Sequence, residues 1–486
     1  MTQINIKNLT FGYDGSSHKL FDNITMTLDS DWKLALAGRN GRGKTTFLRL
    51  LRGELPYEGT ITGVPSASLF PNDDDTLAPD WRVRKELNLM QADPDIMYRP
   101  FDTLSGGERT KLMLARLFSE DGIYPMIDEP TNHLDRVGRE AVAKYLASKD
   151  GFILISHDRN FLDLCTDHTL MITKTGFELT STVFSTWWEN NETRMESERA
   201  KNDQLKKEMS AIDEAMKKNA RWSSKAESYK NRGKAPGKVA EDHFRRAYEA
   251  EKARKLMSAA KNLERRNERK LEEKQSLLKD LERSEKLKIT GTEHHSKTPI
   301  IFKDLTLMRG SNVVISGFDL EACRGEKISF QGPNGCGKST LLKFILGQGV
   351  EEGVDFFGDI YFAQGLKISY VSQETSWLSG TLLDIAMLRG ADKTQFSTIL
   401  IKMGFDPEML KRDASTLSLG QKKCVMIALS LCEQADLYIW DEPLNYIDIY
   451  MRKEIERLVR DSDITLLFVE HDKAFCEAVA DREIVL

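Results

Sequence analysis

Two glycine-rich stretches have the spacing of a phosphate-binding loop. GRNGRGKT begins at Gly38 and GPNGCGKS begins at Gly332, and both read G-x-x-x-x-G-K-[ST]. In such a loop, backbone N–H groups wrap phosphate oxygens and the lysine places its charge on the terminal phosphates. The hydroxyl that follows the lysine is a natural Mg²⁺ ligand. The residues expected to hold the nucleotide here are Gly38, Asn40, Gly41, Gly43, Lys44, Thr45 and Thr46, and Gly332, Asn334, Gly335, Gly337, Lys338, Ser339 and Thr340.

Each loop is followed by an adjacent pair of acidic residues. YPMIDEP ends an apolar run with Asp128 and Glu129, and IWDEP ends another with Asp441 and Glu442. The aspartate suits coordination of Mg²⁺, and the glutamate suits polarisation of an attacking water. We therefore predict Glu129 and Glu442 as catalytic residues. The predicted Mg²⁺ ligands are Thr45, Asp128, Ser339, Asp441 and Gln373. Gln373, within SYVSQE, is also predicted to contact the nucleotide.

Two further motif pairs keep the same order in both halves. LSGGE (Leu104–Glu108) and LSLGQ (Leu417–Gln421) each place a serine and glycine at an expected helix start, which forms an anion-binding cap. ISHD and VEHD then supply His157 and His471, which could contact the γ-phosphate and which we place with the catalytic residues. A lone capped helix or a lone histidine is more often structural, but the shared order favours function. The cap residues predicted to contact nucleotide are Ser105, Gly106, Gly107, Ser418, Gly420 and Gln421.

The elements that must position these residues form two similar halves with a different segment between them. Each half alternates short β-branched runs with amphipathic stretches, which is typical of a mixed α/β core. LALAG and ISFQG are expected to be buried strands that lead into the phosphate loops. In the middle, Leu205, Met209, Ile212 and Met216 follow a heptad spacing, and NRGKAPGK interrupts it before the helical pattern resumes. We predict an α/β domain at 1–185, an antiparallel helical hairpin at 186–290 with its tip near 217–240, and a second α/β domain at 298–486.

Composition narrows the class of protein. The 486 residues suffice for two or three domains, and 40% of them are hydrophobic. No run of 18 apolar residues occurs, which excludes a membrane-spanning helix, and the N-terminus lacks the pattern of a secretion signal. The six cysteines form no CxxC pair, a pattern that suits the reducing cytoplasm and argues against disulfides or a zinc site.

The net charge of −5 is unevenly distributed. Residues 191–288 carry 28 Lys/Arg and 19 Asp/Glu, a balance of +9, whereas the remainder carries 42 against 56, a balance of −14. A basic segment within an acidic protein indicates a polyanionic partner for that segment.

The predicted hairpin tip combines cations with aromatic side chains. Between residues 217 and 238 there are eight Lys/Arg and one acid. Cations neutralise phosphates and aromatic rings stack on bases, so this composition suits RNA; a solvated coiled-coil tip is the alternative. The predicted RNA-binding residues are Lys217, Lys218, Arg221, Trp222, Lys225, Tyr229, Lys230, Arg232, Lys234 and Lys238.

The motif set resembles the ATP-binding cassette (ABC) superfamily over both halves. In that family two cassettes face head to tail, and the resemblance implies two ATP sites within one monomeric chain. One site would join Lys44, Asp128, Glu129 and His157 to Ser418 and Gly420, and the other would join Lys338, Asp441, Glu442 and His471 to Ser105 and Gly107. The family stacks an aromatic residue on adenine, which points to Tyr13. The second half departs from the pattern: Arg309 or Met308 aligns with Tyr13, Gln373 aligns with Asn72, and LSLGQ lacks one glycine. Both glutamates are intact, so we expect hydrolysis at both sites.

Tandem cassettes, the absence of a membrane segment, a long charged linker and the stretches EPTNHLD and DEPLNYID resemble the ABC-F branch. Its members bind the ribosome at the tRNA exit site and leave after hydrolysis. SKAESYKNRGKAPGK, KLMSAAKNLERR and SYVSQETSWLSG further resemble the Lsa- and Vga-type ribosome-protection subgroup. The resemblance implies ATP and Mg²⁺ as cofactors, the 70S ribosome with its 23S rRNA and P-site tRNA as partner, and protection against lincosamides, streptogramin A and pleuromutilins.

Three other functions remain open from the sequence. A housekeeping ABC-F translation factor would share fold, partner and chemistry. The ATPase subunit of an efflux transporter would need a separate membrane partner. A DNA-handling ABC ATPase usually carries zinc pairs or much longer coiled coils.

Overall fold

The computed structural model describes residues 2–13, 19–71, 80–173, 176–231 and 296–486. The chain divides into two compact units, one formed by Met1–Trp187 with Glu285–Leu486, the other by Trp188–Ser284. The first unit contains both α/β halves, here called the first cassette (up to Trp187) and the second cassette (from residue 296). The predicted domain boundaries at 185, 290 and 298 stay predictions.

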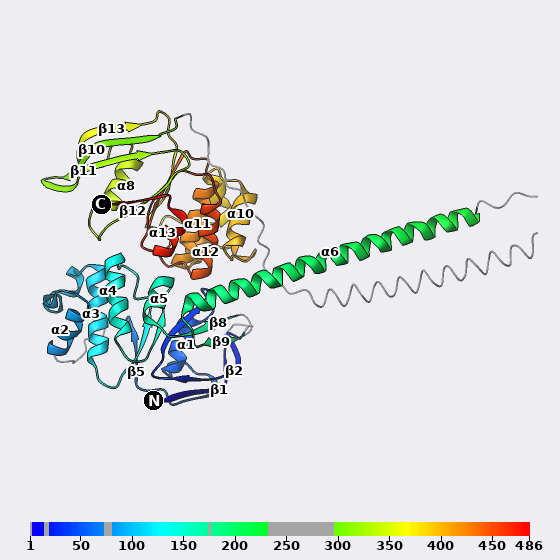
Figure 1. The fold of residues 1–486 in the computed structure, drawn as a ribbon, viewed down its shortest axis with the longest axis horizontal. Helices are drawn as coiled ribbons and strands as arrows, with labels where there is room; N and C mark the ends of the chain where they lie inside the picture. The colour runs from blue at the N-terminus through cyan, green and yellow to red at the C-terminus, as the bar shows by residue number, and fades with distance from the viewer. Residues whose placement is uncertain (1, 14–18, 72–79, 174–175, 232–295) are drawn as a thin grey trace, which may run out of the picture. The chain divides into compact units, whose positions relative to one another are not determined.

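The first cassette consists of two sheets and their helices (Figure 1). Strands β1 (Gln3–Phe11), β2 (Phe21–Asp29) and β4 (Glu58–Thr62) form an antiparallel sheet in the order β2-β1-β4. The larger sheet has the order β5-β6-β7-β3-β8-β9, with β5 (Ala67–Phe70), β6 (Tyr124–Asp128), β7 (Phe152–Ile155), β3 (Lys33–Gly38), β8 (His168–Ile172) and β9 (Phe177–Thr180). All its neighbours are parallel except β8 and β9. The α-helices are α1 (Lys44–Leu51), α2 (Asp80–Leu89), α3 (Gly106–Ser119), α4 (Arg136–Ala147) and α5 (Arg159–Cys165).

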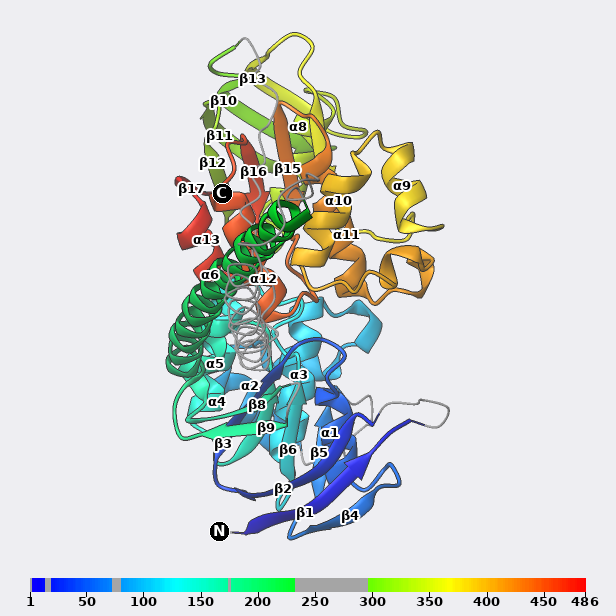
Figure 2. The ribbon, with the colours of Figure 1, turned by 90° about the vertical axis from the view of Figure 1, so that its right-hand side faces the viewer.

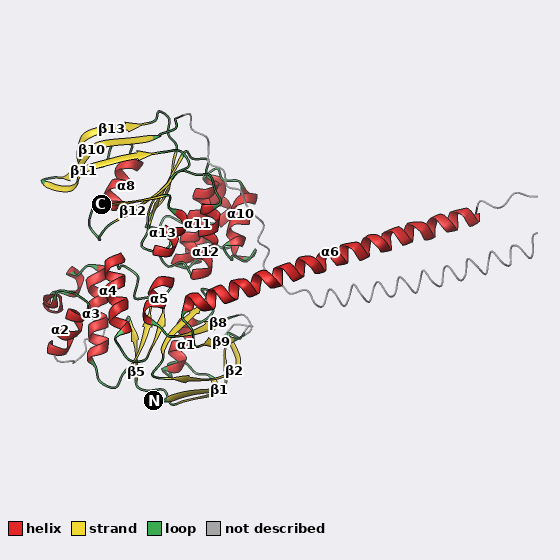
Figure 3. Ribbon diagram, viewed as in Figure 1, coloured by secondary structure: helices red, strands yellow, loops and turns green. Residues whose placement is uncertain are grey.

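The second cassette repeats this plan (Figure 3). An antiparallel sheet β11-β10-β13 is formed by β10 (Ile300–Arg309), β11 (Asn312–Ala322) and β13 (Asp355–Phe362). A parallel sheet β14-β15-β16-β12-β17 is formed by β14 (Ile368–Val371), β15 (Leu437–Asp441), β16 (Leu466–Val469), β12 (Lys327–Gln331) and β17 (Arg482–Val485). Its α-helices are α8 (Lys338–Leu346), α9 (Leu382–Leu388), α10 (Lys393–Lys402), α11 (Leu419–Cys432), α12 (Ile449–Arg460) and α13 (Lys473–Val479).

The cores explain why these strands are almost wholly apolar. In the first cassette, residues of β1, β2, β3, α1, β6, β7 and β8 share one buried cluster between the two sheets. In the second, one cluster joins β10, β11 and β12 to α8, and another fills the opposite face of the parallel sheet under α9–α13. A parallel strand covered on both faces must be apolar on both, which is how LALAG and ISFQG differ from alternating edge strands. The predicted pair of α/β halves is confirmed.

The second unit is described through one long helix. Helix α6 (Phe184–Asn231) spans 48 residues, a length of about 70 Å at 1.5 Å per residue; Figure 2 views its ribbon from a second direction. It contains the heptad residues Leu205, Met209, Ile212 and Met216, as predicted. The returning arm of the predicted hairpin lies outside the described residues. Within the described part of the chain, no helix combines the length and apolarity needed to cross a membrane.

The order of the parallel strands brings the sequence motifs together. β6, β7 and β3 are direct neighbours in the first cassette, as β15, β16 and β12 are in the second. β3 ends at the phosphate loop, β6 ends at Asp128, and β7 is followed by His157. Carboxyl ends of parallel strands lie at one edge of a sheet, so motifs far apart in sequence meet there.

Candidate active sites

The first phosphate loop is held in a conformation that glycine permits. Gly43 has φ +89°, and a Cβ on it would lie 2.7 Å from a methyl carbon of Leu20 and 2.8 Å from the ring of Phe21. The Lys44 ammonium donates to the carbonyl of Gly38 at 2.8 Å and to Oδ1 of Asn40 at 3.3 Å. Burial lowers the pKa of Lys44, while the charges of Asp448, Glu129 and Asp128 oppose that shift. The lysine therefore stands inside the loop with acidic groups around it.

The second phosphate loop has the same construction. Gly337 has φ +101°, and a Cβ there would lie 2.6 Å from a methyl carbon of Val314. Lys338 donates to the carbonyls of Gly332 and Pro333, both at 2.8 Å. The remaining predicted loop residues of both cassettes lie in the same two loops and first helical turns: Gly41, Thr45, Thr46, Asn334, Gly335, Ser339 and Thr340.

The hydroxyl after each lysine contacts the aspartate at the end of the neighbouring strand. Thr45 Oγ1 donates to Asp128 Oδ2 at 2.6 Å, and Ser339 Oγ donates to Asp441 Oδ1 at 3.4 Å. Gln373 Nε2 also donates to Asp441 Oδ1, at 3.2 Å. Burial raises the pKa of both aspartates, against the hydroxyl hydrogen bonds. Such a set of oxygen donors suits Mg²⁺. Asn72, the first-cassette counterpart of Gln373, lies outside the described residues.

The two catalytic candidates adopt the same strained backbone. Glu129 has φ +53° and Glu442 has φ +48°, values that non-glycine residues seldom adopt. Their amides donate to the carbonyls of Ile155 (2.9 Å) and Val469 (3.0 Å) on the adjacent strand, which fixes the turn. Burial, and then the charge of Asp128, raises the pKa of Glu129 to about 8. Burial, followed by the charge of Glu470, raises the pKa of Glu442.

Each glutamate faces the histidine predicted for its site. Glu129 Oε1 lies 3.3 Å from His157 Nε2, and Glu442 Oε1 lies 3.8 Å from His471 Nε2. Among the buried side-chain atoms that the structure describes, Glu129 Oε1 and both ring nitrogens of His471 have no hydrogen-bond partner. Burial, with the charges of Lys44 and Arg452, lowers the pKa of His157 well below its usual range. Burial, with Arg139 and Lys338, lowers that of His471 to about 4.

Replacement of His471 by Gln is expected to make the nucleotide-free protein less sensitive to acid. The pKa of His471 is about 4 in the folded chain against 6.5 ordinarily, so below pH 6.5 the unfolded chain binds a proton that the folded chain does not. Stability is therefore unaffected above pH 7 and is lost as the pH falls, by about 1.4 kcal/mol per pH unit down to the folded pKa. Thermal unfolding at pH 7 and pH 5 measures this, and the drop in midpoint should be smaller in H471Q.

A residue without a titratable side chain in the same cassette gives the control. Gln348 Nε2 donates to the Leu366 carbonyl at 3.2 Å, and Q348A should keep the wild-type drop between pH 7 and pH 5. An H471Q protein with the full wild-type drop would contradict the assignment of acid sensitivity to this side chain.

The signature segments begin α3 and α11 with a complete capping box. Ser105 Oγ accepts from the amide of Glu108 (3.3 Å), and the Glu108 carboxylate accepts from the amide of Ser105 (2.7 Å). Ser418 and Gln421 do the same at 3.3 and 3.0 Å. The Gln421 side chain is thus engaged in the cap. These motifs can both cap their helices and bind an anion, because the other amides of the first helical turn have no partner within the helix.

The phosphate loop of each cassette forms hydrogen bonds with the other cassette. The Asn40 amide donates to Asp448 Oδ2 at 2.9 Å, and its side-chain amide donates to the Tyr446 carbonyl at 3.3 Å. Reciprocally, the Asn334 amide donates to Asp135 Oδ2 at 3.1 Å, and its side-chain amide donates to the His133 carbonyl at 3.3 Å. Each aspartate uses its other oxygen to cap the helix that follows it, α4 at Gly138 and α12 at Met451.

The signature glycines lie beside these cross-bonds. A Cβ on Gly420 would overlap the Tyr446 carbonyl and stand 3.5 Å from Asn40 Nδ2. A Cβ on Gly106 would lie 2.6 Å from His133 Cβ, and one on Gly107 would lie 3.5 Å from the His133 carbonyl. The second signature is thus brought to the first phosphate loop, and the first signature to the loop that bonds Asn334, in the exchange that the family resemblance implies.

A cavity of about 540 Å³ opens on the first site. Its lining joins Tyr13 and the phosphate loop to Asp128, Glu129 and His157, and includes Tyr446 of the second cassette. Tyr13 is 52% exposed, and its hydroxyl pairs with Thr46 Oγ1 at 2.8 Å, which presents the ring at the cavity mouth. Ser418 and Gly420 are not among the lining residues that the structure describes. In the second cassette Arg309 ends β10 and pairs with Asn312 across the turn.

The donor set fits a magnesium nucleotide. Positive-φ glycines open the loop amides toward an anion, a lysine stands inside each loop, and hydroxyl and carboxylate oxygens converge beside it. Glu129 Oε1 and the His471 nitrogens remain as buried polar atoms with capacity for a ligand. The arrangement can therefore bind a polyphosphate and activate a water in line with it.

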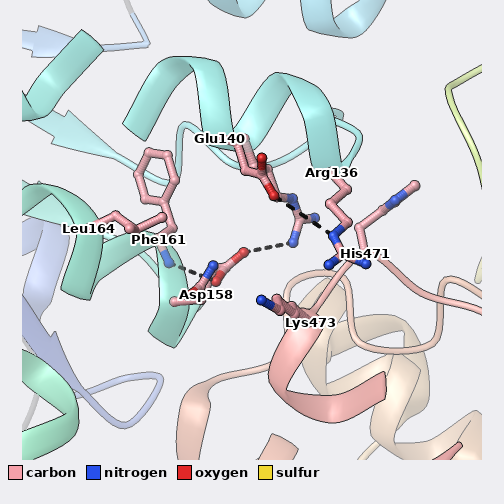
Figure 4. Close-up of a pocket in the computed structure, with 9 residues that line it drawn as sticks. Arg136, Glu140, Asp158, Phe161, Leu164, His471 and Lys473 are labelled. Carbon is pink, nitrogen blue, oxygen red and sulfur yellow. Dashed lines mark hydrogen bonds and ion pairs between the residues drawn. The ribbon is translucent and has the colours of Figure 1, made fainter. Parts of the chain in front are cut away.

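Sequence reasoning missed a pair of buried ion pairs beside the sites. Arg139 Nη1 lies 2.9 Å from Asp158 Oδ2, and Arg452 Nη1 lies 2.9 Å from Asp472 Oδ2. Each Arg Nε also donates to a carbonyl just before the cross-bonding aspartate. Figure 4 shows the small pocket that Arg136, Glu140 and Asp158 line together with His471 and Lys473 of the second cassette. The signal was present, because each arginine stands four residues after Asp135 or Asp448.

The predicted RNA-binding residues fall partly within the described chain. Lys217 is exposed on α6. Lys218, Arg221, Trp222, Lys225, Tyr229 and Lys230 lie within the same helix. Arg232, Lys234 and Lys238 lie outside the described residues.

Comparison with known proteins gives three kinds of likeness. The family described as "ABC transporter" matches residues 21–132 and 315–445. The chain is 26% identical to "Ribosome protection protein VmlR" of Bacillus subtilis, over 98% of this chain and 85% of that protein. It is 28% identical to "Erythromycin resistance ATP-binding protein MsrA" of Staphylococcus epidermidis, over 98% of both chains. It is 26% identical to "ATP-binding protein Uup" of Caulobacter vibrioides, over 96% of this chain and 74% of that protein.

Among solved structures, an archaeal ribosome recycling factor aABCE1 in complex with the stalk protein aP1 matches with a TM-score of 0.61 at 19% identity, over 98% of this chain and 87% of that chain. "RNase-L Inhibitor" matches with a TM-score of 0.60 at 19% identity, over 99% and 87%. At this identity the likeness is one of fold.

Proposed function

This chain belongs to the ABC transporter family and hydrolyses ATP, and on that premise we propose that it is an ABC-F ribosome protection factor. In its ATP-bound form it binds the exit-site region of the 70S ribosome and protects the peptidyl-transferase centre from lincosamides, streptogramin A and pleuromutilins; hydrolysis releases it. One observation carries the proposal. Two cross-bonded cassettes flank a basic helical linker in a chain that aligns over 98% of its length with a protein named for ribosome protection and with one named for erythromycin resistance.

The chemistry follows from the residues at each site. Lys44 and Lys338 neutralise the terminal phosphates, and Tyr13 packs against the base at the first site. Thr45 with Asp128, and Ser339 with Asp441 and Gln373, would hold Mg²⁺, which supplies Lewis-acid stabilisation of the phosphate charge. Glu129 and Glu442 orient the attacking water and accept its proton. Mg²⁺ beside Asp128 would favour the ionised form of Glu129, whose pKa is about 8 in the nucleotide-free chain. His157 and His471 are neutral, since their pKa values are lowered, and can donate one hydrogen bond toward the γ-phosphate without adding charge.

The cross-cassette bonds connect nucleotide binding to closure. Asn40 and Asn334 stand within the phosphate loops, and each bonds an aspartate of the other cassette. The signature segments, through Ser105, Gly107, Ser418 and Gly420, complete the opposite site when the cassettes close. Because both cassettes belong to one chain, the pairing is intramolecular and a monomer suffices.

The partner is inferred from the linker. Residues 191–288 have a balance of +9 within an otherwise acidic protein. Such a segment favours ribosomal RNA and tRNA phosphates over the acidic surface of most proteins. The tip, near 217–240, would contact 23S rRNA and the P-site tRNA, which places the protein in the cytoplasm.

In vitro translation with lincomycin tests the proposal. Addition of the wild-type protein with ATP is expected to restore translation, and replacement of Lys217, Lys218 and Arg221 by Ala is expected to weaken ribosome binding by about tenfold or more, because three phosphate contacts are lost. Lys201, Lys206 and Lys207 are exposed on the same helix, so their triple alanine variant is the matched control and should keep protection.

The same assay separates the second candidate function. "ATP-binding protein Uup" of Caulobacter vibrioides and "Probable ATP-binding protein YheS" of Escherichia coli also align over 95% or more of this chain, at 26% and 25% identity. A protein that binds ribosomes but leaves lincomycin inhibition unchanged would be a housekeeping translation factor and would overturn the protection function.

A further inference from the structure

A buried lysine reaches the catalytic loop of the second cassette from the signature helix. Lys423, in α11, is 3% exposed, and its ammonium donates to the carbonyls of Ser372 (2.8 Å) and Glu442 (3.4 Å). Ser372 directly precedes Gln373, whose side chain donates to Asp441. One ammonium therefore joins the signature helix, the Gln373 segment and the backbone of the catalytic glutamate.

A buried glutamate holds the same loop from the other side. Glu470 follows β16 and is 2% exposed. Its Oε2 accepts from the Leu444 amide at 3.1 Å, two residues after Glu442. Its Oε1 accepts from the amides of His471 (2.7 Å) and Asp472 (3.3 Å). Both carboxylate oxygens are thus in use, one on the loop of the catalytic glutamate and the other on the loop of the histidine.

The first cassette has a neutral hydroxyl residue at each equivalent position. Thr110 stands five residues after Ser105, as Lys423 does after Ser418. Its hydroxyl donates to the Gly106 carbonyl of its own helix at 3.1 Å, so it does not leave the helix.

Ser156 precedes His157 as Glu470 precedes His471. Its hydroxyl pairs with that of Thr131 at 3.2 Å, which joins the two loops through side chains. Leu444 stands where Thr131 does in the first cassette and has no hydroxyl, and the Glu470 carboxylate reaches its backbone amide instead.

Lys423 and Glu470 place a buried amine and a buried carboxyl group beside the loop of Glu442. A single buried charge without a counter-charge is costly, whereas hydrogen bonds to an ionised group are stronger than those between neutral groups. Burial lowers the pKa of Lys423, and the charges of Asp441, Glu442 and Glu470 oppose this shift. Burial raises the pKa of Glu470, and the charges of Arg452 and Arg139 oppose this shift. Glu470 thus supplies part of the counter-charge of Lys423, whereas its own counter-charges are the two arginines.

We propose that Lys423 and Glu470 are positioning residues of the second ATP site, which fix the backbone on both sides of Glu442 and thereby set hydrolysis at that site. The first site relies on hydroxyl contacts of Ser156 and Thr131 for the same loops. The two sites of one chain are therefore held by different chemistry, and their hydrolysis can be altered separately.

Single-turnover ATP hydrolysis in the Glu129→Gln background tests this, because the second site then carries the remaining intact glutamate. K423T is expected to lower the rate constant about tenfold or more, while half-saturation by ATP shifts less than about threefold. K423R keeps a cationic donor and should retain more hydrolysis than K423T. E470Q should behave like K423T, since glutamine has one acceptor oxygen and places an N–H₂ group against a backbone N–H donor.

Two neighbouring residues supply matched controls. Lys422 is adjacent to Lys423 but only half-buried, and Glu477 is 63% exposed in α13 beside Lys473. K422T and E477Q should leave hydrolysis and the thermal midpoint unchanged. K423T and E470Q proteins with full hydrolysis and a lowered thermal midpoint would show a purely structural role and overturn the proposal.

The assignment to one site is tested in the Glu442→Gln background, where the first site keeps its glutamate. There K423T and E470Q should change hydrolysis by less than about threefold. An equal loss in both backgrounds would mean that these residues act on the whole protein rather than on the second site. The double variant K423T, E470Q in the Glu129→Gln background should lose little more than the worse single variant, because both act through one loop.

Discussion

The double variant Glu129→Gln, Glu442→Gln is expected to hydrolyse ATP about 10²- to 10⁴-fold more slowly than the wild type, the range lost with a general base. Both glutamates directly follow a parallel strand, lie beside a hydroxyl–aspartate pair and face a neutral histidine. Glutamine therefore keeps the shape of the site and removes the proton acceptor. If hydrolysis releases the protein as proposed, the variant should accumulate on ribosomes in the presence of ATP. Phosphate release and co-sedimentation measure the two effects.

Two exposed glutamates outside the sites provide the control for this result. Glu58 in β4 and Glu483 in β17 are both exposed, and their double glutamine variant should hydrolyse ATP and leave ribosomes as the wild type does. Absence of the catalytic double variant from the ribosome pellet with ATP would sink the release mechanism, even if hydrolysis falls as expected.

Replacement of Arg452 by Met should destabilise the second cassette by about 3–5 kcal/mol, the usual cost of removing one partner of a buried ion pair. Arg452 is 6% exposed, lies 2.9 Å from Asp472, and donates through Nε to the Ile447 carbonyl at 2.8 Å. Its loss leaves the 1%-exposed Asp472 carboxylate without this partner and frees the backbone next to Asp448. Urea unfolding of the nucleotide-free protein, followed by intrinsic fluorescence, measures the change.

A surface pair on the same helix isolates the effect of burial. Arg457 pairs with Glu454 at 2.9 Å, with side chains 32% and 28% exposed. Arg457→Met should cost less than about 1 kcal/mol, as is usual for exposed pairs. The double variant R452M, D472N should recover part of the loss, because no buried charge then lacks its counterpart. Equal destabilisation by R452M and R457M would show that burial does not increase the contribution of the Arg452–Asp472 pair to the free energy of unfolding.

The motif set occurs in both halves of the chain, and this repetition allowed much of each site to be predicted from the sequence. Gly38 and Asp128 end β3 and β6, and His157 follows β7, three neighbouring parallel strands whose carboxyl ends lie at one edge. The motifs and the strands before them could be predicted from the sequence, and the parallel order of those strands brings the motifs together. Side chains such as Arg452 escaped prediction because their role depends on a partner twenty residues away in sequence, and spacing does not give depth of burial. Lys423 and Glu470 have Thr110 and Ser156 as their counterparts in the first cassette. This difference is visible in the sequence, but its meaning depends on the contacts that the two side chains make in the structure.

The departures from the family pattern have a structural reason that sequence could not supply. LSLGQ places Leu419 where the first cassette has Gly106. A Cβ on Gly106 would press on His133, whereas Leu419 is 50% exposed beside a loop with Tyr446 at the position of His133. Gly420 has no such freedom, because a Cβ there would overlap the Tyr446 carbonyl. One glycine of the motif is thus replaceable in the second cassette and the next is not.

The shared aspartates have a consequence for how ATP titrations of this protein must be understood. Asp448 and Asp135 each divide their two oxygens between a helix of their own cassette and a phosphate loop of the other. A nucleotide that shifts one phosphate loop therefore acts on a carboxylate that also anchors the opposite cassette. By thermodynamic reciprocity, occupancy of either site must change the affinity of the other by the same factor. We therefore expect an ATP titration to give two stepwise binding constants for the whole molecule, and not a separate constant for each site.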